Sequence, residues 1–154
     1  IHGVPVLILI DSGATHNFIS CPLVHKMNWN VEETLSMNIK LGDGSCSRTK
    51  GSCVDMGVNI EGVSFVLNAH LFDLGVVDMV LGMEWLSTLG DMIVNWNTQT
   101  MSFWYNKQWV TLKGMDEQHM MNSLQSIVCK HQGSQMRSNM EKEFVQGGAQ
   151  WVTT

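Results

Sequence analysis

Residues 7–15 read LILIDSGAT, an apolar run that ends at one carboxylate in a Ser-Gly turn. The continuous apolar run over residues 4–10 predicts a strand that is buried on both faces. A carboxylate against such a strand costs several kcal/mol unless its charge is shared or hydrogen-bonded, so Asp11 is either a structural cap or a functional acid. Gly13 lets the backbone approach closely and offers an N–H to that carboxylate. Taken alone, the tripeptide is typical of an ordinary turn.

Apolar and polar residues alternate along much of the following sequence, which is the pattern of half-buried β-strands. The strands are expected at residues 35–41, 54–60, 63–69, 76–81, 93–96, 101–105 and 109–112. Ser20 and Pro22 introduce a short helix over 21–27, and a second helix over 83–89 ends at Gly90. Strands at this spacing, without long helices between them, predict an all-β, closed or folded-over β-barrel-like domain with one or two short helices.

The composition changes near Gly114, which divides the chain into a body and a tail. Residues 1–114 hold most of the aliphatic and aromatic side chains, whereas residues 115–154 are rich in Gln, Ser, Asn and Met. A segment with so little apolar surface cannot offset the entropy of ordering its backbone, so the tail is predicted to be a polar linker toward a following segment. Because the sequence begins with Ile1 rather than Met, we expect it to be cut from a longer chain.

Charge and cysteine content exclude several classes of function. The chain has 9 basic and 14 acidic residues and no basic stripe, so nucleic acid is not an expected partner. Its apolar runs are far shorter than the roughly 20 residues of a membrane helix, so no membrane association is expected. The cysteines form no four-ligand pattern, so neither a metal nor a cofactor is expected, and their number favours reduced thiols in the cytoplasm. A bridge between Cys46 and Cys53 is the less favoured alternative.

Three motifs follow one another along the body. DSGATHNFIS occupies residues 11–20, KLGDGS residues 40–45 and VLGMEWL residues 80–86. In this order they resemble the catalytic turn, the flap hairpin and the psi-loop element of retropepsin-like aspartic proteases. In detail they are most similar to the protease region of gypsy-type (plant-like) retrotransposon gag-pol polyproteins. The resemblance extends over residues 1–114 and implies the acid-protease fold.

The resemblance also implies a role for each motif. Asp11 is the implied catalytic residue, supported in its turn by Ser12, Gly13 and Ala14. The implied flap and substrate-binding residues are Leu41, Gly42, Asp43, Gly44 and Ser45, and the psi-loop residues beneath the turn are Val80, Leu81 and Gly82. Relatives carry an additional strand before the position of Ile1. Retroviral members place an Arg after the psi-loop Gly, where this chain has Met83 and Glu84.

A single Asp-Ser-Gly turn supplies only one carboxylate, so the resemblance implies a symmetric homodimer with two copies of Asp11. Two carboxylates about 3 Å apart share one proton. The ionised carboxylate activates a water, while the protonated one donates to the scissile carbonyl. Ser12 braces the opposite turn in this scheme, and the flap closes over an extended peptide. The expected substrate is the polyprotein itself, cleaved inside the cell or within virus-like particles.

Other interpretations of the same residues stay open. The retropepsin fold also suits a non-catalytic dimerisation or interaction module, similar to the protease-like domain of ubiquitin-shuttle proteins, or a degenerate transposon remnant. Asp78 is more simply a hydrogen-bonding loop residue than a second acid. His16 with Ser12 or Ser20 lacks the Gly-x-Ser-x-Gly elbow of a hydrolase triad. Four tryptophans are expected in the core or at its rim rather than as a platform for bases, namely Trp85, Trp96, Trp104 and Trp109.

Overall fold

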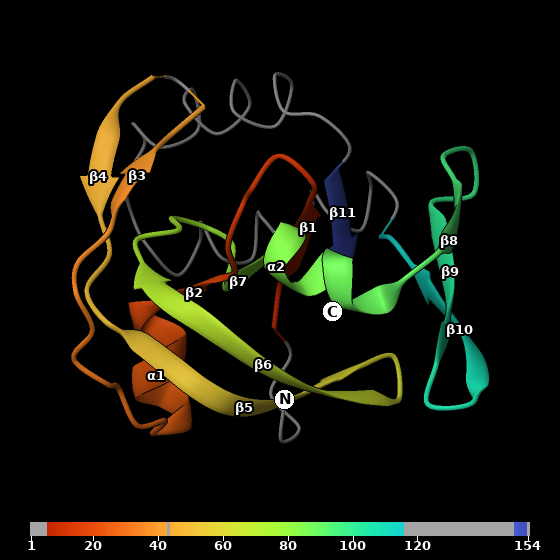
Figure 1. Ribbon diagram of the computed structural model, residues 1–154, viewed down its shortest axis with the longest axis horizontal. Coiled ribbons are helices and arrows are strands. Elements are labelled where there is room, and N and C mark those ends of the chain that lie inside the picture. The colour runs from red at the N-terminus through yellow and green to blue at the C-terminus, as the bar shows by residue number, and fades with distance from the viewer. Residues whose placement is uncertain (1–5, 43, 116–149, 154) are drawn as a thin grey trace.

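Three β-sheets form the framework of the computed structural model, which describes residues 6–42, 44–115 and 150–153. The largest sheet contains, in spatial order, β11 (Gln150–Thr153), β1 (Ile8–Asp11), β7 (Met79–Leu81), β2 (Phe18–Ser20), β6 (Val63–Phe72) and β5 (Ser52–Ile60). The second sheet contains β10 (Gln108–Lys113), β9 (Thr100–Tyr105) and β8 (Met92–Asn95). The third is a hairpin of β3 (Asn38–Lys40) and β4 (Cys46–Arg48). Figure 1 shows this hairpin at one end of the molecule and β8–β10 at the other.

Two short α-helices lie where the sequence predicts them. The helix α1 (Cys21–Met27) is capped by Ser20, whose hydroxyl accepts the N–H of Leu23 over 3.3 Å, and it ends at Asn28 with a left-handed φ of 52°. The helix α2 (Met83–Leu86) continues into a 3₁₀ turn, η1 (Ser87–Leu89), which ends at Gly90. Within the described ranges, no helix is both long and apolar enough to cross a membrane.

The long hairpin of β5 and β6 confirms most of the predicted alternation and corrects one position. Phe65, Leu67 and Ala69 are buried on β6, as the period-2 pattern predicts. On β5 the register shifts between Cys53 and Met56, around a residue of positive φ at position 55. This β-bulge reverses the faces of the strand, so Val54 is 41% exposed and Cys53 is buried. The prediction that Val54 faces the core is therefore wrong.

The strand predicted at residues 35–41 is shorter than the alternation indicates. Strand β3 spans only Asn38–Lys40, and Leu35 is 93% exposed. Strand β3 begins only at Asn38 because the Met37 N–H donates to the Thr49 hydroxyl over 3.0 Å instead of to a backbone carbonyl, although the Met37 carbonyl still accepts the Thr49 N–H over 3.1 Å. The run predicted at 4–10 has its first two residues outside the described ranges, and β1 itself covers Ile8–Asp11.

Two of the cysteines occupy different sheets, which removes the cross-hairpin bridge considered from the sequence. Cys46 is exposed on β4 and pairs with Lys40, whereas Cys53 is buried on β5 and pairs with Ala69. Both thiols are free, and burial together with nearby Cys21 raises the pKa of the Cys53 thiol.

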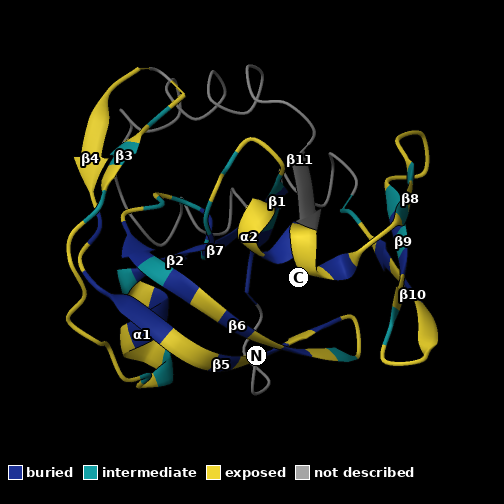
Figure 2. Ribbon diagram, viewed as in Figure 1, coloured by how far each residue is buried: buried dark blue, intermediate teal, exposed yellow. Residues whose placement is uncertain are grey.

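Aromatic side chains join the sheets into one core. Phe65 of β6 contacts Trp85 of α2, with ring centroids 5.5 Å apart, and Tyr105 of β9 at 4.7 Å. Phe103 of β9 is fully buried and lies 6.3 Å from Trp85. Figure 2 shows the buried residues concentrated on the facing sides of these strands and helices. The core thus ties α2, which follows β7 directly, to both larger sheets.

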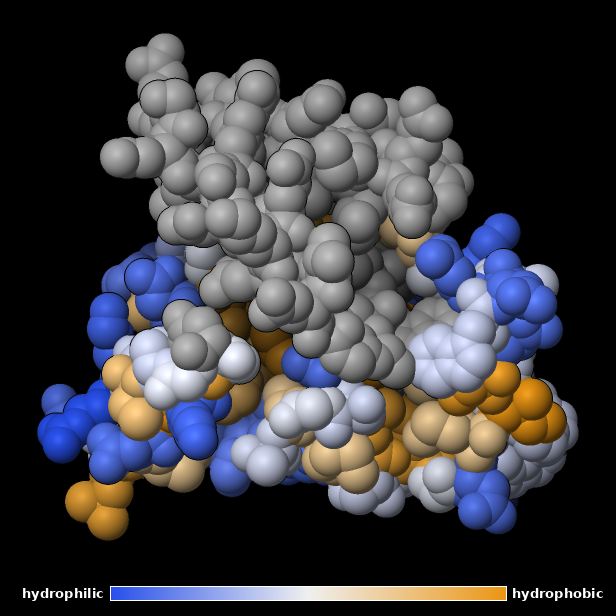
Figure 3. All heavy atoms as spheres, turned by 90° about the horizontal axis from the view of Figure 1, so that it is seen from above, coloured by the Kyte–Doolittle hydropathy of each residue, from blue (hydrophilic) through white to orange (hydrophobic). Residues whose placement is uncertain are grey.

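Of the four tryptophans expected in the core or at its rim, only Trp85 is buried, whereas Trp96, Trp104 and Trp109 lie on the surface. Trp104 and Trp109 are paired across β9 and β10, 55% and 61% exposed, with ring centroids 5.8 Å apart. Trp96 is 60% exposed and Ile93 of β8 is 65% exposed. Figure 3 shows hydrophobic residues at the surface of this end of the molecule.

The tail predicted over residues 115–154 contributes a strand to the largest sheet. Residues 116–149 lie outside the described ranges. Residues Gln150–Thr153 form β11, which runs antiparallel to β1 along its whole length. The expectation of a plain polar linker did not include this strand.

Candidate active site

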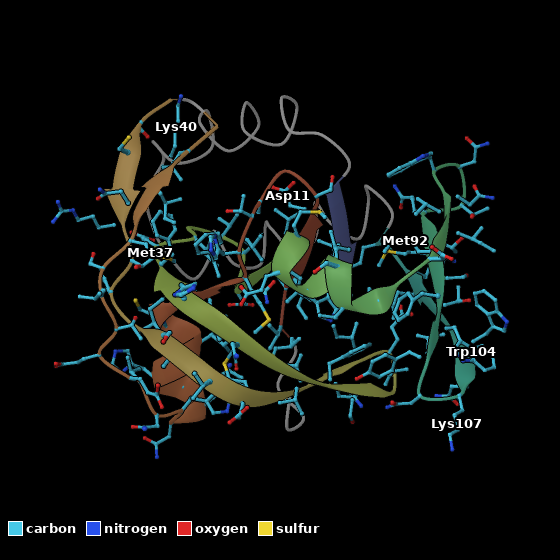
Figure 4. The ribbon with its side chains drawn as sticks, in the orientation of Figure 1. Asp11, Met37, Lys40, Met92, Trp104 and Lys107 are labelled. Atoms are coloured by element: carbon cyan, nitrogen blue, oxygen red, sulfur yellow. The ribbon has the colours of Figure 1, made fainter. Side chains whose placement is uncertain are left out.

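Asp11 lies at the end of β1, where the chain turns sharply (Figure 4). The N–H of Gly13 donates to Asp11 Oδ1 over 2.8 Å, and the N–H of Ala14 donates to the Asp11 carbonyl over 3.2 Å. A Cβ at position 13 would lie 3.1 Å from the same Oδ1, so glycine allows the amide its close approach. Asp11 is half-buried, while Ser12 and Gly13 are exposed. The turn therefore orients a carboxylate that solvent and ligands can still reach.

Gly82 packs directly beneath this turn. A Cβ at this position would collide with the backbone carbonyl of His16 and lie 2.6 Å from the Ala14 carbonyl oxygen. Because Gly82 has no side chain, the two amides that follow it can reach the turn. The Met83 N–H donates to the Ala14 carbonyl over 2.8 Å, and the Glu84 N–H donates to the Thr15 carbonyl over 3.1 Å. The start of α2 is therefore bonded to the backbone of the Asp-Ser-Gly turn.

Val80 and Leu81 place Gly82 at that position. Strand β7 runs parallel to β1, with Leu9 opposite Val80 and Ile10 opposite Leu81, and antiparallel to β2, with Phe18 opposite Val80. The psi-loop strand is thus held between the strands that enter and leave the turn. The order in which these segments meet agrees with the arrangement that the sequence motifs predicted.

Asp78 anchors the beginning of the same strand. Its Oδ2 accepts the N–H of Leu7 over 2.8 Å, and its backbone carbonyl accepts the N–H of Ser20 over 2.9 Å. These bonds hold the residue just before β1 and the last residue of β2. The prediction that Asp78 is a structural hydrogen-bonding residue is confirmed.

Asn17 is a buried polar residue that joins three segments behind the turn, and it is only 3% exposed. Its Oδ1 accepts the N–H of Gly82 over 3.0 Å, and its Nδ2 donates to the Asn68 carbonyl over 3.0 Å. Its backbone carbonyl accepts the N–H of His70 over 2.9 Å, and its own N–H donates to Glu84 Oε2 over 3.1 Å. Every polar group of Asn17 is therefore satisfied, which fixes β6, β7 and the turn relative to one another.

Glu84 is the second site residue that the sequence motifs did not assign. Its backbone N–H donates to the Thr15 carbonyl, and its carboxylate accepts the N–H of Asn17. The helix α2 is therefore hydrogen-bonded to the segment after the turn at two points. The retroviral pattern expects an Arg one residue earlier, where Met83 is exposed. In this chain the Glu84 carboxylate, which accepts the backbone N–H of Asn17, supports the turn instead of an Arg side chain. The available signals were an Asn directly before the apolar residues of β2 and a Glu directly after Gly-Met.

Two imidazoles lie beside this network. The rings of His16 and His70 meet edge to face, with centroids 5.5 Å apart, and His70 Nδ1 is buried without a hydrogen-bond partner among the described residues. Burial lowers the pKa of His70, the His16 ring lowers it further, and the Glu84 carboxylate opposes both effects. His16 Nδ1 bonds to Thr15 Oγ1 over 2.8 Å rather than to a serine, so the hydrolase triad is not assembled.

The hairpin predicted as the flap is present and is formed by β3 and β4. The Leu41 N–H donates to the Ser45 carbonyl over 2.8 Å, and the Gly44 N–H donates to the Leu41 carbonyl over 2.9 Å. Gly44 has a φ of 85°, which favours glycine, while Gly42 and Ser45 are exposed and Asp43 lies outside the described residues. Lys40 marks this hairpin in Figure 4.

Apolar residues connect the flap with the turn. Ile39 and Leu41 pack against a cluster that also receives Ala14 of the turn and Leu9 of β1. The buried members of this cluster come from β2, β6, β7 and the adjoining segments, namely Leu7, Phe18, Phe72, Val77 and Val80. Apolar side chains therefore link the hairpin to the turn that carries the carboxylate.

Comparison with known proteins accounts for this arrangement. Residues 1–108 match the family model described as retroviral aspartyl protease. The chain belongs to this family. A similar solved structure is the retroviral protease-like domain of Ddi1 from Leishmania major, with a TM-score of 0.52 and 14% identity over 74% of this chain and 88% of that chain. No curated protein matches.

The family assignment and the structural likeness confirm the predicted retropepsin-like fold, which is mostly β-sheet with two short helices. At 14% identity the likeness to the Ddi1 domain shows the fold alone. The structure brings Asp11, Gly13, Ala14 and Gly82 together through the contacts described above, and their catalytic and supporting roles stay predictions. No cluster of three or more potential metal ligands occurs in the described ranges.

Proposed function

We propose that this chain is one half of an aspartic endopeptidase that works as a symmetric homodimer. The observation that carries the proposal is the Asp11 carboxylate, fixed by the Gly13 amide at the end of a core strand and left half-open to solvent. The body contains one such turn, so a second copy has to supply the second carboxylate. Ser12 is exposed at the same turn, where its hydroxyl can brace the turn of the opposite copy.

In this mechanism the two Asp11 carboxylates share one proton. The ionised carboxylate takes a proton from a water held between the two, and the protonated one donates to the scissile carbonyl oxygen. A tetrahedral intermediate forms when the water oxygen adds to the carbonyl carbon. The two carboxylates then exchange roles. The one that took a proton from water donates it to the nitrogen of the leaving amine, and the other takes a proton from the intermediate. The flap residues close over the extended peptide through backbone hydrogen bonds.

We further propose that the substrate is the polyprotein of a gypsy-type retrotransposon, cleaved in the cytoplasm or within virus-like particles. The motifs DSGATHNFIS and VLGMEWL support this origin by their resemblance to that branch. The flap hairpin, which apolar side chains link to the Asp11 turn, supports an extended peptide as the substrate.

Peptide cleavage by the Asp11→Asn variant tests the mechanism. The variant keeps the size of the side chain and an oxygen for the Gly13 amide, so it is expected to fold and to dimerise as the wild type does. Its kcat is expected to fall about 10²–10⁴-fold or more, because the acid–base pair is lost. Asp91→Asn, a change of an exposed carboxylate outside the turn, is the matched control and keeps full activity. Unchanged cleavage by Asp11→Asn contradicts the proposed mechanism.

Association state distinguishes the protease from the alternative of a non-catalytic interaction module. Analytical ultracentrifugation at mildly acid pH is expected to show a dimer, with activity rising as the dimer forms. A chain that stays monomeric at high micromolar concentration and cleaves no peptide from its own flanks supports the interaction module instead.

A further inference from the structure

Strand β1 has two neighbours in the described structure, and they cover it to different extents. On one side β7 pairs with Ile8, Leu9 and Ile10, and this pairing stops before Asp11. On the other side β11 pairs with all four residues of β1, and its last pair joins Asp11 to Gln150. Among the described strands, β11 is thus the one whose register extends to Asp11 itself.

The edge that β11 covers is one that needs a partner. Ile8 and Ile10 are 1% and 2% exposed, so β1 is embedded in the core and cannot move away from its neighbours. Backbone N–H and C=O groups on an open edge require hydrogen bonds, and an apolar edge strand is a template for pairing with other chains. Among the described strands, β11 alone covers this edge of the strand that carries Asp11.

The residues of β11 suit this role although the tail around them is polar. The strand reads Gln-Trp-Val-Thr, and Trp, Val and Thr all favour extended backbone. Residues 116–149 connect it to the body, and the entropy cost of closing a connection rises only slowly with its length. A four-residue strand at the end of a long polar segment can therefore still pair.

We propose that Gln150–Thr153 is a positioning element of the active half-site, an edge strand that holds the end of β1 and with it the Asp11 turn. The expected effect on catalysis rests on the proposed function, whereas the pairing of β11 with β1 does not depend on any activity. Residues 150–153 belong with the protease domain, and their removal loosens the turn without unfolding the remaining sheets.

Hydrogen–deuterium exchange tests the pairing without reference to proteolysis. In the full chain the amides of Ile8–Asp11 are expected to exchange slowly, and deletion of residues 150–154 is expected to speed them at least about tenfold. Strands β5 and β6 serve as the internal reference, because they pair with each other away from β11. Unchanged exchange of Ile8–Asp11 after the deletion overturns the proposal.

Two proline variants supply a matched pair within β11. Successive backbone N–H groups of a strand point to opposite sides, so only one of Trp151 and Val152 directs its N–H at β1. One of the variants Trp151→Pro and Val152→Pro is therefore expected to reproduce the fast exchange of the deletion, and the other to stay closer to wild type. Wild-type exchange in both variants overturns the proposal.

Kinetics then connect the strand to catalysis. With the proposed protease, the deletion is expected to lower kcat about tenfold or more and to leave KM within about twofold, because β11 pairs with the strand that carries Asp11, whereas the described flap strands pair in a separate sheet. If no form of the chain cleaves peptide while exchange changes as expected, the proposed function fails and the strand assignment stands. If the wild type cleaves peptide and the deletion leaves both kcat and exchange unchanged, the strand assignment fails alone.

Discussion

The backbone N–H of Gly82 donates to the side-chain oxygen of Asn17 over 3.0 Å, although the two residues are 65 positions apart. The bond is buried and joins the psi-loop to the strand that leaves the Asp-Ser-Gly turn. Two further bonds from the start of α2 reach Ala14 and Thr15. The geometry of the turn is therefore determined by a distant segment as much as by its own residues.

Replacing Gly82 by alanine tests how closely these segments fit. The added Cβ meets backbone carbonyls of Ala14 and His16, which cannot move aside without opening the turn. Gly82→Ala is expected to lower the free energy of unfolding by about 3 kcal/mol or more in urea titrations. Gly57→Ala is the control, since a Cβ there meets no atom within 4 Å, and it is expected to be neutral or slightly stabilising. Equal stability of the two variants contradicts the packing described.

Replacing Asn17 by leucine tests the buried hydrogen-bond network. The variant leaves the Gly82 amide and the Asn68 carbonyl without partners, each at a cost of about 1–3 kcal/mol. The midpoint of thermal unfolding should fall accordingly. Asn30→Leu, at an exposed position, is the matched substitution and is expected to change the free energy of unfolding by less than about 0.5 kcal/mol. A loss no larger than that of the control would show that Asn17 is not a structural centre.

Glu84 raises the pKa of His70 and His16 lowers it, so replacing each residue is expected to shift this pKa in opposite directions. Glu84→Gln removes the charge that favours the imidazolium, so the pKa of His70 is expected to fall further. His16→Gln removes the neighbouring positive charge, so the pKa of His70 is expected to rise. Histidine C–H resonances followed by NMR across pH 4 to 8 measure both shifts. Glu33→Gln, an exposed carboxylate, is the control, and shifts of equal sign in the two variants contradict the geometry.

The lowered pKa of His70 predicts how stability responds to acid. Below the ordinary histidine pKa the unfolded chain binds a proton that the folded chain resists, so the folded state loses stability as the pH falls through that value. His70→Gln removes this contribution. Urea midpoints measured from pH 7.5 to pH 5 are expected to fall more steeply for the wild type than for the variant. Parallel curves would show that His70 titrates alike in both states.

The strands of the body could be predicted because their signals are local. The alternation of apolar and polar residues predicted β6, and the motif VLGMEWL predicted β7 and α2. In these segments the spacing of the apolar residues shows which side faces the core. Val54 was misplaced because its face depends on a β-bulge, and β3 is short because the Met37 N–H bonds to the Thr49 side chain. No sequence period reveals either feature. The motifs predicted a site at Asp11, Gly13 and Gly82, and the catalytic role of these residues stays a prediction.

Asn17, Glu84 and β11 could not be predicted, for a physical reason they share. Each acts through a partner far along the chain: Asn17 through Gly82 and Asn68, and β11 through β1. Local composition carries little information about such pairings. Asn17, a polar residue just ahead of a short strand, reads as an exposed position until its partners are known.

The parallel pairing of β1 with β7 has a consequence for the order in which the molecule is made. A ribosome that has released residues 1–77 has produced Asp11 but not the strand and the glycine that hold its turn. Contacts of such large sequence separation form late and slowly in folding. A nascent chain therefore carries an unfinished turn until the VLGMEWL segment emerges, so the half-site matures only after synthesis has passed it.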